Sequence, residues 1–133
     1  MIIAAYVCTL LLFVGIDLVW LMGPGRPLYV AEIGSLLRSQ PLMGPAFAFY
    51  ALYAAGLTYF AVWPGVSNGS AVQALGTGAL FGLMAYATYD LTNLAVVNGF
   101  TTRIALIDMA WGSVLSGLVA GAVVKGLSLV TSG

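Results

Sequence analysis

Four long apolar stretches, separated by short links, dominate the pattern of the chain. They run over about residues 2–22, 42–63, 72–97 and 104–130. Each is long enough to cross a bilayer, because a helix needs about 20 apolar residues to span the hydrocarbon core. The apolar runs are continuous rather than alternating, which favours helices over a β-barrel. The sequence therefore predicts an all-α bundle of four transmembrane helices in a single membrane domain covering residues 1–133.

The link between the first two stretches is a polar segment that runs from Arg26 to Gln40, after the helix-breaking Gly23-Pro24-Gly25. On a helix its apolar residues can share one side, while its charged residues face water. These are Leu28, Ile33, Leu36 and Leu37 on the apolar side, and Arg26, Glu32 and Arg38 on the charged side. The pattern predicts a short helix in the membrane interface, since the segment is too polar to span. An ordered loop is the alternative.

Helix-breaking residues also end the second stretch. Trp63-Pro64-Gly65 is expected to stop that helix at the far interface, where Trp is favoured. Residues 66–71 are then expected to form a turn rich in Ser, Asn and Gly.

Small and polar residues recur every four positions in the third stretch. Gly78 and Gly82 precede Tyr86 and Asp90 on one helix face, and Asn93 continues that side. Small residues spaced in this way allow two helices to approach closely in a membrane. The third helix is therefore expected to pack tightly along its glycine half and to present polar groups along the other half.

Three aspartates lie inside the apolar stretches, at similar distances from the helix ends. Asp17 is near the end of the first stretch, Asp90 near the end of the third and Asp108 near the start of the fourth. At 1.5 Å rise per residue, each should lie roughly 5–12 Å from its helix end. Because carboxylates at membrane depth are costly, all three are expected to face inward and to line one polar pocket.

Three close carboxylates cannot all ionise cheaply in a low dielectric. Arg103 is one turn before Asp108 and is the expected ion partner. Alternatively, one acid stays protonated, a cation binds, or the acids act only as structural hydrogen-bond acceptors for Tyr and Trp side chains. Asp17-x-x-Trp20 and Asp108-x-x-Trp111 also place an acid and an indole on one helix face, although the surrounding sequence shows no repeat.

Composition supports an integral membrane protein, since 62% of residues are hydrophobic and only 6% are charged. The net charge is zero without a basic patch, so nucleic acid is not an expected partner. The chain has no histidine, no metal-ligand cluster of the usual kind and no nucleotide-binding loop, so we expect neither a metal nor a cofactor. Cys8 is alone and is expected to behave as a small apolar residue.

The arginines predict an orientation in the membrane. Arg26, Arg38 and Arg103 fall in the first and third links, and Lys125 is at the opposite end. The positive-inside rule then gives cytoplasmic links and periplasmic termini.

Several strings resemble an uncharacterised family of small bacterial integral membrane proteins. The likeness rests on the string from Tyr86 to Asn93 with its Tyr-Asp-Leu-Thr-Asn motif, on Asp108-Met-Ala-Trp-Gly112 and on Asp17-Leu-Val-Trp20, and it covers nearly the whole chain. The resemblance implies four spans in a bacterial inner membrane and no established activity. Family members are sometimes encoded near fatty-acid-modifying enzymes, which favours a lipid-like ligand.

The leading hypothesis is therefore a site for a lipid-like or amphipathic small molecule between the helices. Acids would hold its polar end, and aromatic residues, Tyr50 and Tyr53 among them, its apolar body. The candidate ligand-binding residues are Asp17, Trp20, Tyr86, Tyr89, Asp90, Asn93, Asp108 and Trp111. If the site is catalytic, Asp90 is the candidate general base, with Asp108 or Asp17 as its protonated partner.

Two other functions stay open at this point. Acids inside spans can relay protons or cations in a transporter, and four spans per chain would then require a homodimer. The acids, however, cluster near one membrane face, whereas transporter sites usually lie near the midplane. The third hypothesis is an accessory subunit of a membrane complex, which docks through its small-residue faces.

Overall fold

The structure is a computed structural model that describes residues 1–37 and 42–131, and these residues form helices without any strand. The elements are α1 (Ile2–Met22), α2 (Gly25–Ile33), the 3₁₀ turn η1 (Gly34–Leu36), α3 (Met43–Leu57), the π-helical turn η2 (Thr58–Val62), α4 (Trp63–Asn68), α5 (Ala71–Val96) and α6 (Thr102–Thr131). Four helical stretches in the described part are long and apolar enough to cross a membrane: α1, α3 to α4, α5 and α6. The predicted four-helix membrane bundle is thus confirmed. The predictions for Arg38 and Gln40 lie outside the described residues.

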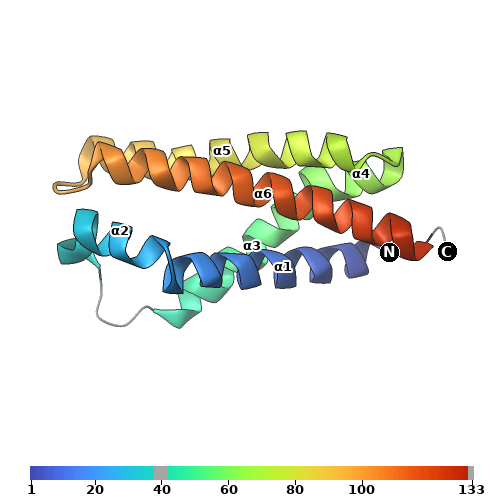
Figure 1. The fold of residues 1–133 in the computed structure, drawn as a ribbon, viewed down its shortest axis with the longest axis horizontal. Helices are drawn as coiled ribbons and strands as arrows, with labels where there is room; N and C mark the ends of the chain where they lie inside the picture. Colours follow the sequence, from blue (N-terminus) through green and yellow to red (C-terminus); the bar gives the residue numbers. More distant parts are fainter. Residues whose placement is uncertain (38–41, 132–133) are drawn as a thin grey trace.

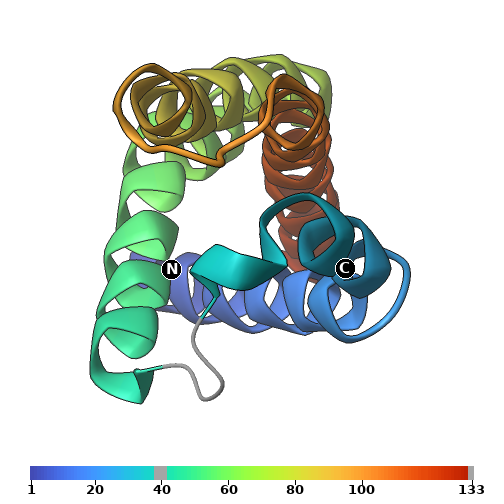
Figure 2. The ribbon, with the colours of Figure 1, turned by 90° about the vertical axis from the view of Figure 1, so that its left-hand side faces the viewer.

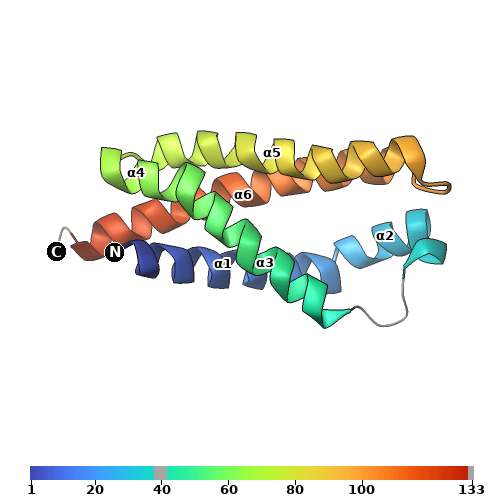
Figure 3. The same cartoon turned by 180° about the vertical axis from the view of Figure 1, so that it is seen from behind.

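The four long stretches surround a common axis (Figure 2). α5 and α6 form an antiparallel hairpin along the length of the molecule, and α1 runs beside it (Figure 1). α3 slants across the bundle, close to α5 at its η2 end and far from it at its Met43 end (Figure 3). Both termini lie at one end, so the links that carry Arg26 and Arg103 lie at the other (Figure 1).

The second span is longer than the sequence predicts. The helix passes through Pro64 and ends only at Gly69, which adopts a left-handed conformation with φ of 66°. A proline inside an α-helix removes one hydrogen bond and clashes with the carbonyl group four residues earlier. Here η2 ends at Val62, two residues before Pro64, and a π-helical turn widens the backbone locally where that conflict would arise. The prediction that Trp63-Pro64-Gly65 ends the helix is therefore wrong.

Glycines set the close packing of α5 against α6. A Cβ atom added at Gly78 would lie 2.8 Å from the Cβ of Ala120, and one added at Gly82 would collide with the carbonyl oxygen of Gly112. Real Cβ atoms do not approach other atoms so closely, so only glycine fits at these two positions. The predicted tight packing along the glycine half of the third helix is confirmed.

The polar link forms a helix rather than an ordered loop. α2 runs beside the start of α6, in about the direction of α1 (Figures 1 and 3). It buries Gly25 and Ile33, while Arg26 stays exposed. Seen from the end of the bundle, α2 and η1 lie in front of the four long helices (Figure 2). The segment thus covers the end where the aspartates lie, and its placement in a membrane interface stays a prediction.

Candidate functional site

The three aspartates of the spans line one cavity beneath α2. It has a volume of about 160 Å³, and Asp17 of α1, Asp90 of α5 and Asp108 of α6 all border it. Tyr29 and Ile33 of α2 line its outer side. The counting of helix turns thus predicted correctly that three acids from three helices meet at one depth.

Both carboxyl oxygens of Asp17 accept hydrogen bonds from other side chains of the protein. One carboxylate oxygen accepts a hydrogen bond of 2.6 Å from the Tyr50 hydroxyl, and the other accepts one of 3.0 Å from the Trp111 indole N–H. The side chain is only 6% exposed. Two donors from α3 and α6 therefore satisfy the buried carboxyl group and tie both helices to α1.

Asp108 is held from outside the bundle by α2. The Tyr29 hydroxyl donates a hydrogen bond of 2.5 Å to Asp108, and it accepts one of 3.2 Å from the Trp20 indole N–H. Burial raises the pKa of Tyr29 above its ordinary value, and the hydrogen bond to Asp108 raises it further. The phenol therefore stays protonated and remains a donor to the carboxylate.

The two acid-and-indole motifs bind each other across α1 and α6. The rings of Trp20 and Trp111 stack, with centroids 4.4 Å apart and an interplanar angle of 14°. Trp111 donates directly to the acid of the other motif, Asp17, whereas Trp20 reaches Asp108 through Tyr29. The two motifs thus meet in the structure, with one direct hydrogen bond between them and one chain of hydrogen bonds that passes through Tyr29.

Asp90 differs from the other two acids because the protein gives it no donor. Its side chain is fully buried, and neither carboxyl oxygen has a hydrogen-bond partner within residues 1–37 and 42–131. Asp108 lines the same cavity. Two carboxyl groups offer only acceptors unless a proton or another donor lies between them. Asp90 thus lines the cavity with two oxygen atoms that accept no hydrogen bond from the described residues.

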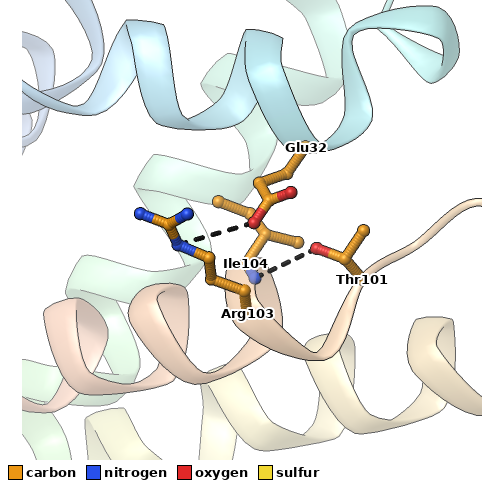
Figure 4. A network of polar contacts seen from close by, with 4 residues as sticks. All are labelled: Glu32, Thr101, Arg103 and Ile104. Atoms are coloured by element: carbon orange, nitrogen blue, oxygen red, sulfur yellow. Dashed lines mark hydrogen bonds and ion pairs between the residues drawn. The ribbon is translucent and has the colours of Figure 1, made fainter.

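Arg103 does not pair with Asp108, contrary to the prediction. Its Nε atom lies 3.6 Å from Glu32 of α2, a residue that was expected to face water (Figure 4). Arg103 belongs to the first turn of α6, where Thr101 caps the helix by accepting a hydrogen bond of 3.2 Å from the Ile104 N–H. The side chain turns outward toward α2 and is 71% exposed, so it brings no positive charge to the acids.

A second, larger cavity adjoins the acids. It has a volume of about 410 Å³ and is lined mostly by apolar and aromatic side chains of α3 and α5, together with Asp108 of α6. Its lining residues are Phe49, Tyr53, Ala85, Tyr86, Tyr89 and Asp108. Tyr86, Tyr89 and Asp108 also line the smaller cavity, so the two cavities share a wall. We call the larger one the apolar cavity and the smaller one the acidic cavity.

The predicted site residues fall into three groups. Five of them line a cavity: Asp17, Tyr86, Tyr89, Asp90 and Asp108. Trp20 and Trp111 stand behind the acids as a stacked pair, and Asn93 is half-buried outside the lining of both cavities. Contrary to expectation, Asn93 does not line the acidic cavity, although residues three apart on a helix differ in direction by only about 60°.

Sequence reasoning missed one hydrogen-bonding residue of the site, Tyr29, and gave two others a different part. The sequence signal for Tyr29 was that it is the one aromatic residue between Arg26 and Leu37. Apolar lining residues such as Phe49 and Ala85 were also not predicted. Tyr50 and Tyr53 were expected to contact a ligand's apolar body. The hydroxyl of Tyr50 instead donates to Asp17, and that of Tyr53 forms a hydrogen bond of 2.6 Å with Ser116. The ring of Tyr53 still lines the apolar cavity.

The arrangement also limits the chemistry of the site. Among the described residues, no group of three Asp, Glu, Cys or His side chains could hold a metal ion. Asp90 and Asp108 line the same cavity, whereas both oxygens of Asp17 accept hydrogen bonds from the protein. Such a site can hold a donor group or move a proton between two carboxyl groups.

Comparison with known proteins gives a family for nearly the whole chain. Residues 2–125 match the family described as "Predicted membrane protein (DUF2177)". Neither the curated proteins nor the solved structures contain a match. The match agrees with the four apolar helical stretches and with the resemblance noted from the sequence. The chain thus belongs to the DUF2177 family of predicted membrane proteins.

Proposed function

We propose that this membrane protein binds an amphipathic, lipid-like small molecule across its two adjoining cavities. The apolar part lies against α3 and α5, and the polar end reaches Asp108 and Asp90. The observation that carries the proposal is the shared wall, because Tyr86, Tyr89 and Asp108 line both an apolar space and an acidic one. A molecule with one apolar and one polar end has the matching shape.

The size and lining of the apolar cavity support this proposal. Its volume of about 410 Å³ falls within the range of about 300–1,000 Å³ that is typical of small-molecule sites. Such sites usually combine many apolar walls with a few polar groups that fix orientation. Phe49 and Tyr89 line the cavity and are 46% and 58% exposed. An amphiphile in the bilayer therefore has a lateral path into the cavity between α3 and α5.

The slant of α3 explains why a cavity forms at this place. α3 packs near α5 only at its η2 end and diverges toward Met43 (Figure 3). The cavity is also lined by Ala85, a small residue that leaves space where a larger side chain would fill it. The helix arrangement and this small side chain thus create the space together.

We further propose that the protein lies in a bacterial inner membrane with its termini in the periplasm. The acidic cavity then faces the cytoplasmic half of the bilayer, under α2. Exposed Arg26 and Arg103 at that end support this orientation, since positive residues favour the cytoplasmic side.

The binding proposal is tested by thermal unfolding of the purified protein in detergent, with increasing amounts of decyl amphiphiles. A ligand that binds the folded state raises the unfolding temperature in a saturable manner. We expect this rise in the wild type, but not in Ala85→Phe, which fills the apolar cavity. Leu80→Phe is the matched control, because Leu80 lies on the same helix and is 57% exposed. Equal shifts in all three proteins, or no saturable shift in the wild type, would refute the proposal.

A further inference from the structure

We infer that the polar end of the ligand is a protonated amine, which Asp90 and Asp108 bind as a pair. This inference rests on the proposed function and names the class of head group that the acidic cavity takes. It starts from a specific deficit: Asp90 is fully buried, lines the cavity and has no donor for either oxygen among the described residues.

The hydrogen-bond donors of an ammonium group match the acceptors that the two aspartates offer. A primary ammonium group has three donors and no acceptor, whereas a carboxylate has two acceptor oxygens and no donor. Asp108 uses one oxygen for the Tyr29 hydroxyl. Both oxygens of Asp90 have no partner among the described residues, and Asp90 and Asp108 line the same acidic cavity. An ammonium group placed in this cavity can donate to both acids at once.

The charges around the cavity favour a cation. Arg103 is directed to Glu32, and Arg26 is exposed on α2. Lys125 is seventeen residues beyond Asp108 on α6, which places it about 25 Å away along the helix. Within the part of the chain that the structure describes, no basic side chain forms an ion pair with the three aspartates that line the cavity. A ligand with a carboxylate or phosphate head would meet like charge here, whereas an amine supplies the missing positive charge.

The aromatic residues between the two cavities suit the same class of ligand. Tyr86 and Tyr89 line both spaces and stand where the apolar tail would join the charged head. Tyrosine rings attract cations through their faces, and they accommodate an alkyl chain equally well. The path from the apolar cavity to Asp90 is therefore suited to an alkyl amine along its whole length.

Three probes of equal chain length test this inference: decylamine, decanol and decanoic acid. Affinities of the purified full chain in lipid nanodiscs are measured near neutral pH, after correction for partition into empty nanodiscs. We expect decylamine to bind about tenfold or more tightly than decanol, since hydrogen bonds between charged groups are the stronger ones. Decanoic acid should bind more weakly than both.

Variants show whether the preference for an amine comes from Asp90 and Asp108 or from negative charge elsewhere at this end of the protein. Asp90→Asn keeps the shape but not the charge, and it should reduce the preference for decylamine over decanol to about twofold. Asp108→Asn should do the same, which keeps the test available if one variant does not fold. Glu32→Gln is the control, because Glu32 is an acid near the same end that lines neither cavity. It should keep the wild-type preference.

The outcomes distinguish the two proposals. If decanol binds the wild type as tightly as decylamine, the amine inference is wrong while the amphiphile site stands. If the preference for decylamine survives in Asp90→Asn and Asp108→Asn, the acid pair is not the amine site. If no probe binds in a saturable manner, the proposed function fails together with the inference.

Discussion

Three aspartates of the same chemical type meet different surroundings in this bundle. Asp17 receives two hydrogen bonds, Asp108 receives one from Tyr29, and Asp90 receives none from the described residues. A buried polar group that the protein satisfies contributes to stability, and one that it leaves unsatisfied lowers it. Asp17 therefore serves the fold, whereas Asp90 is retained at a cost that a ligand would offset.

The stability of two variants should reveal this difference. Asp17→Asn leaves at least one of the donors from Tyr50 and Trp111 without a good acceptor, so we expect it to destabilise the protein by about 1–3 kcal/mol. Asp90→Asn should leave stability unchanged or raise it, because the new amide can donate to Asp108. Thermal unfolding in one detergent compares the two. Equal losses in both variants would show that Asp90 is also a structural residue.

Tyr29 gives a prediction that depends on pH. Its pKa in the folded protein is raised above the ordinary value of about 10, by burial and by Asp108. The stability that the protonated phenol contributes is therefore fully present below about pH 10 and is lost as the pH rises beyond it. Tyr29→Phe should cost about 1–3 kcal/mol near neutral pH, and its deficit relative to the wild type should shrink at alkaline pH. A deficit that stays constant through that range would contradict this account of Tyr29.

For single residues, the sequence could predict how deep a side chain lies in the bundle, but not which residue it pairs with. Counting residues placed Asp17, Asp90 and Asp108 at one level, because the rise per residue of a helix is fixed. The partner of Arg103 could not be found in this way, because proximity along α6 says nothing about Glu32 on another helix. Tyr29 was missed for the same reason, since its contact with Asp108 joins residues 79 positions apart.

Among the elements, the α5–α6 hairpin depends on close contact between backbones. Glycines at the crossing allow this contact, so the prediction made from their four-residue spacing succeeded. The length of the second span was harder to predict, because Pro64 normally indicates the end of a helix. Its tolerance depends on η2, a backbone irregularity without a simple sequence signature.

Two alanine substitutions on α5 test the importance of the close contact. Gly82→Ala would place a methyl group against the Gly112 carbonyl, so we expect a loss of about 1–3 kcal/mol. Gly76→Ala meets no atom within 4 Å and should be neutral or stabilising, because alanine favours helix over glycine by up to about 1 kcal/mol. Unfolding temperatures in the same detergent compare them. If Gly82→Ala were as stable as Gly76→Ala, the tight crossing would be refuted.

For the whole molecule, four helical stretches bring both termini to one end (Figure 1). The acidic cavity is lined by residues of α2 and of the helix ends at the other end. The proposed orientation of the protein in the membrane therefore also sets the side on which this cavity lies. The even number of spans followed from the apolar pattern, whereas the slant of α3 and the apolar cavity beside it did not. The slant arises from packing among several helices. The periodicity of apolar residues in one helix does not predict such packing.

Reporter fusions at the C-terminus test the orientation. We expect a reporter that is active in the periplasm to work there, and one that is active only in the cytoplasm to fail. Replacing Arg26 and Arg103 together by glutamine should weaken this preference, whereas Lys125→Gln should not. A cytoplasmic C-terminus in the wild type would place the acidic cavity on the periplasmic side instead.

Photolabelling tests the central claim, the binding of an amphiphile across the two cavities, most directly. A decyl amphiphile with a diazirine at its chain end is activated on the protein in nanodiscs, and mass spectrometry locates the adducts. The account predicts adducts concentrated on α3 near Phe49 and on α5 from Ala85 to Tyr89, which excess unlabelled amphiphile and Ala85→Phe both remove. Adducts spread over exposed positions such as Val72 and Leu80, unaffected by either treatment, would contradict it.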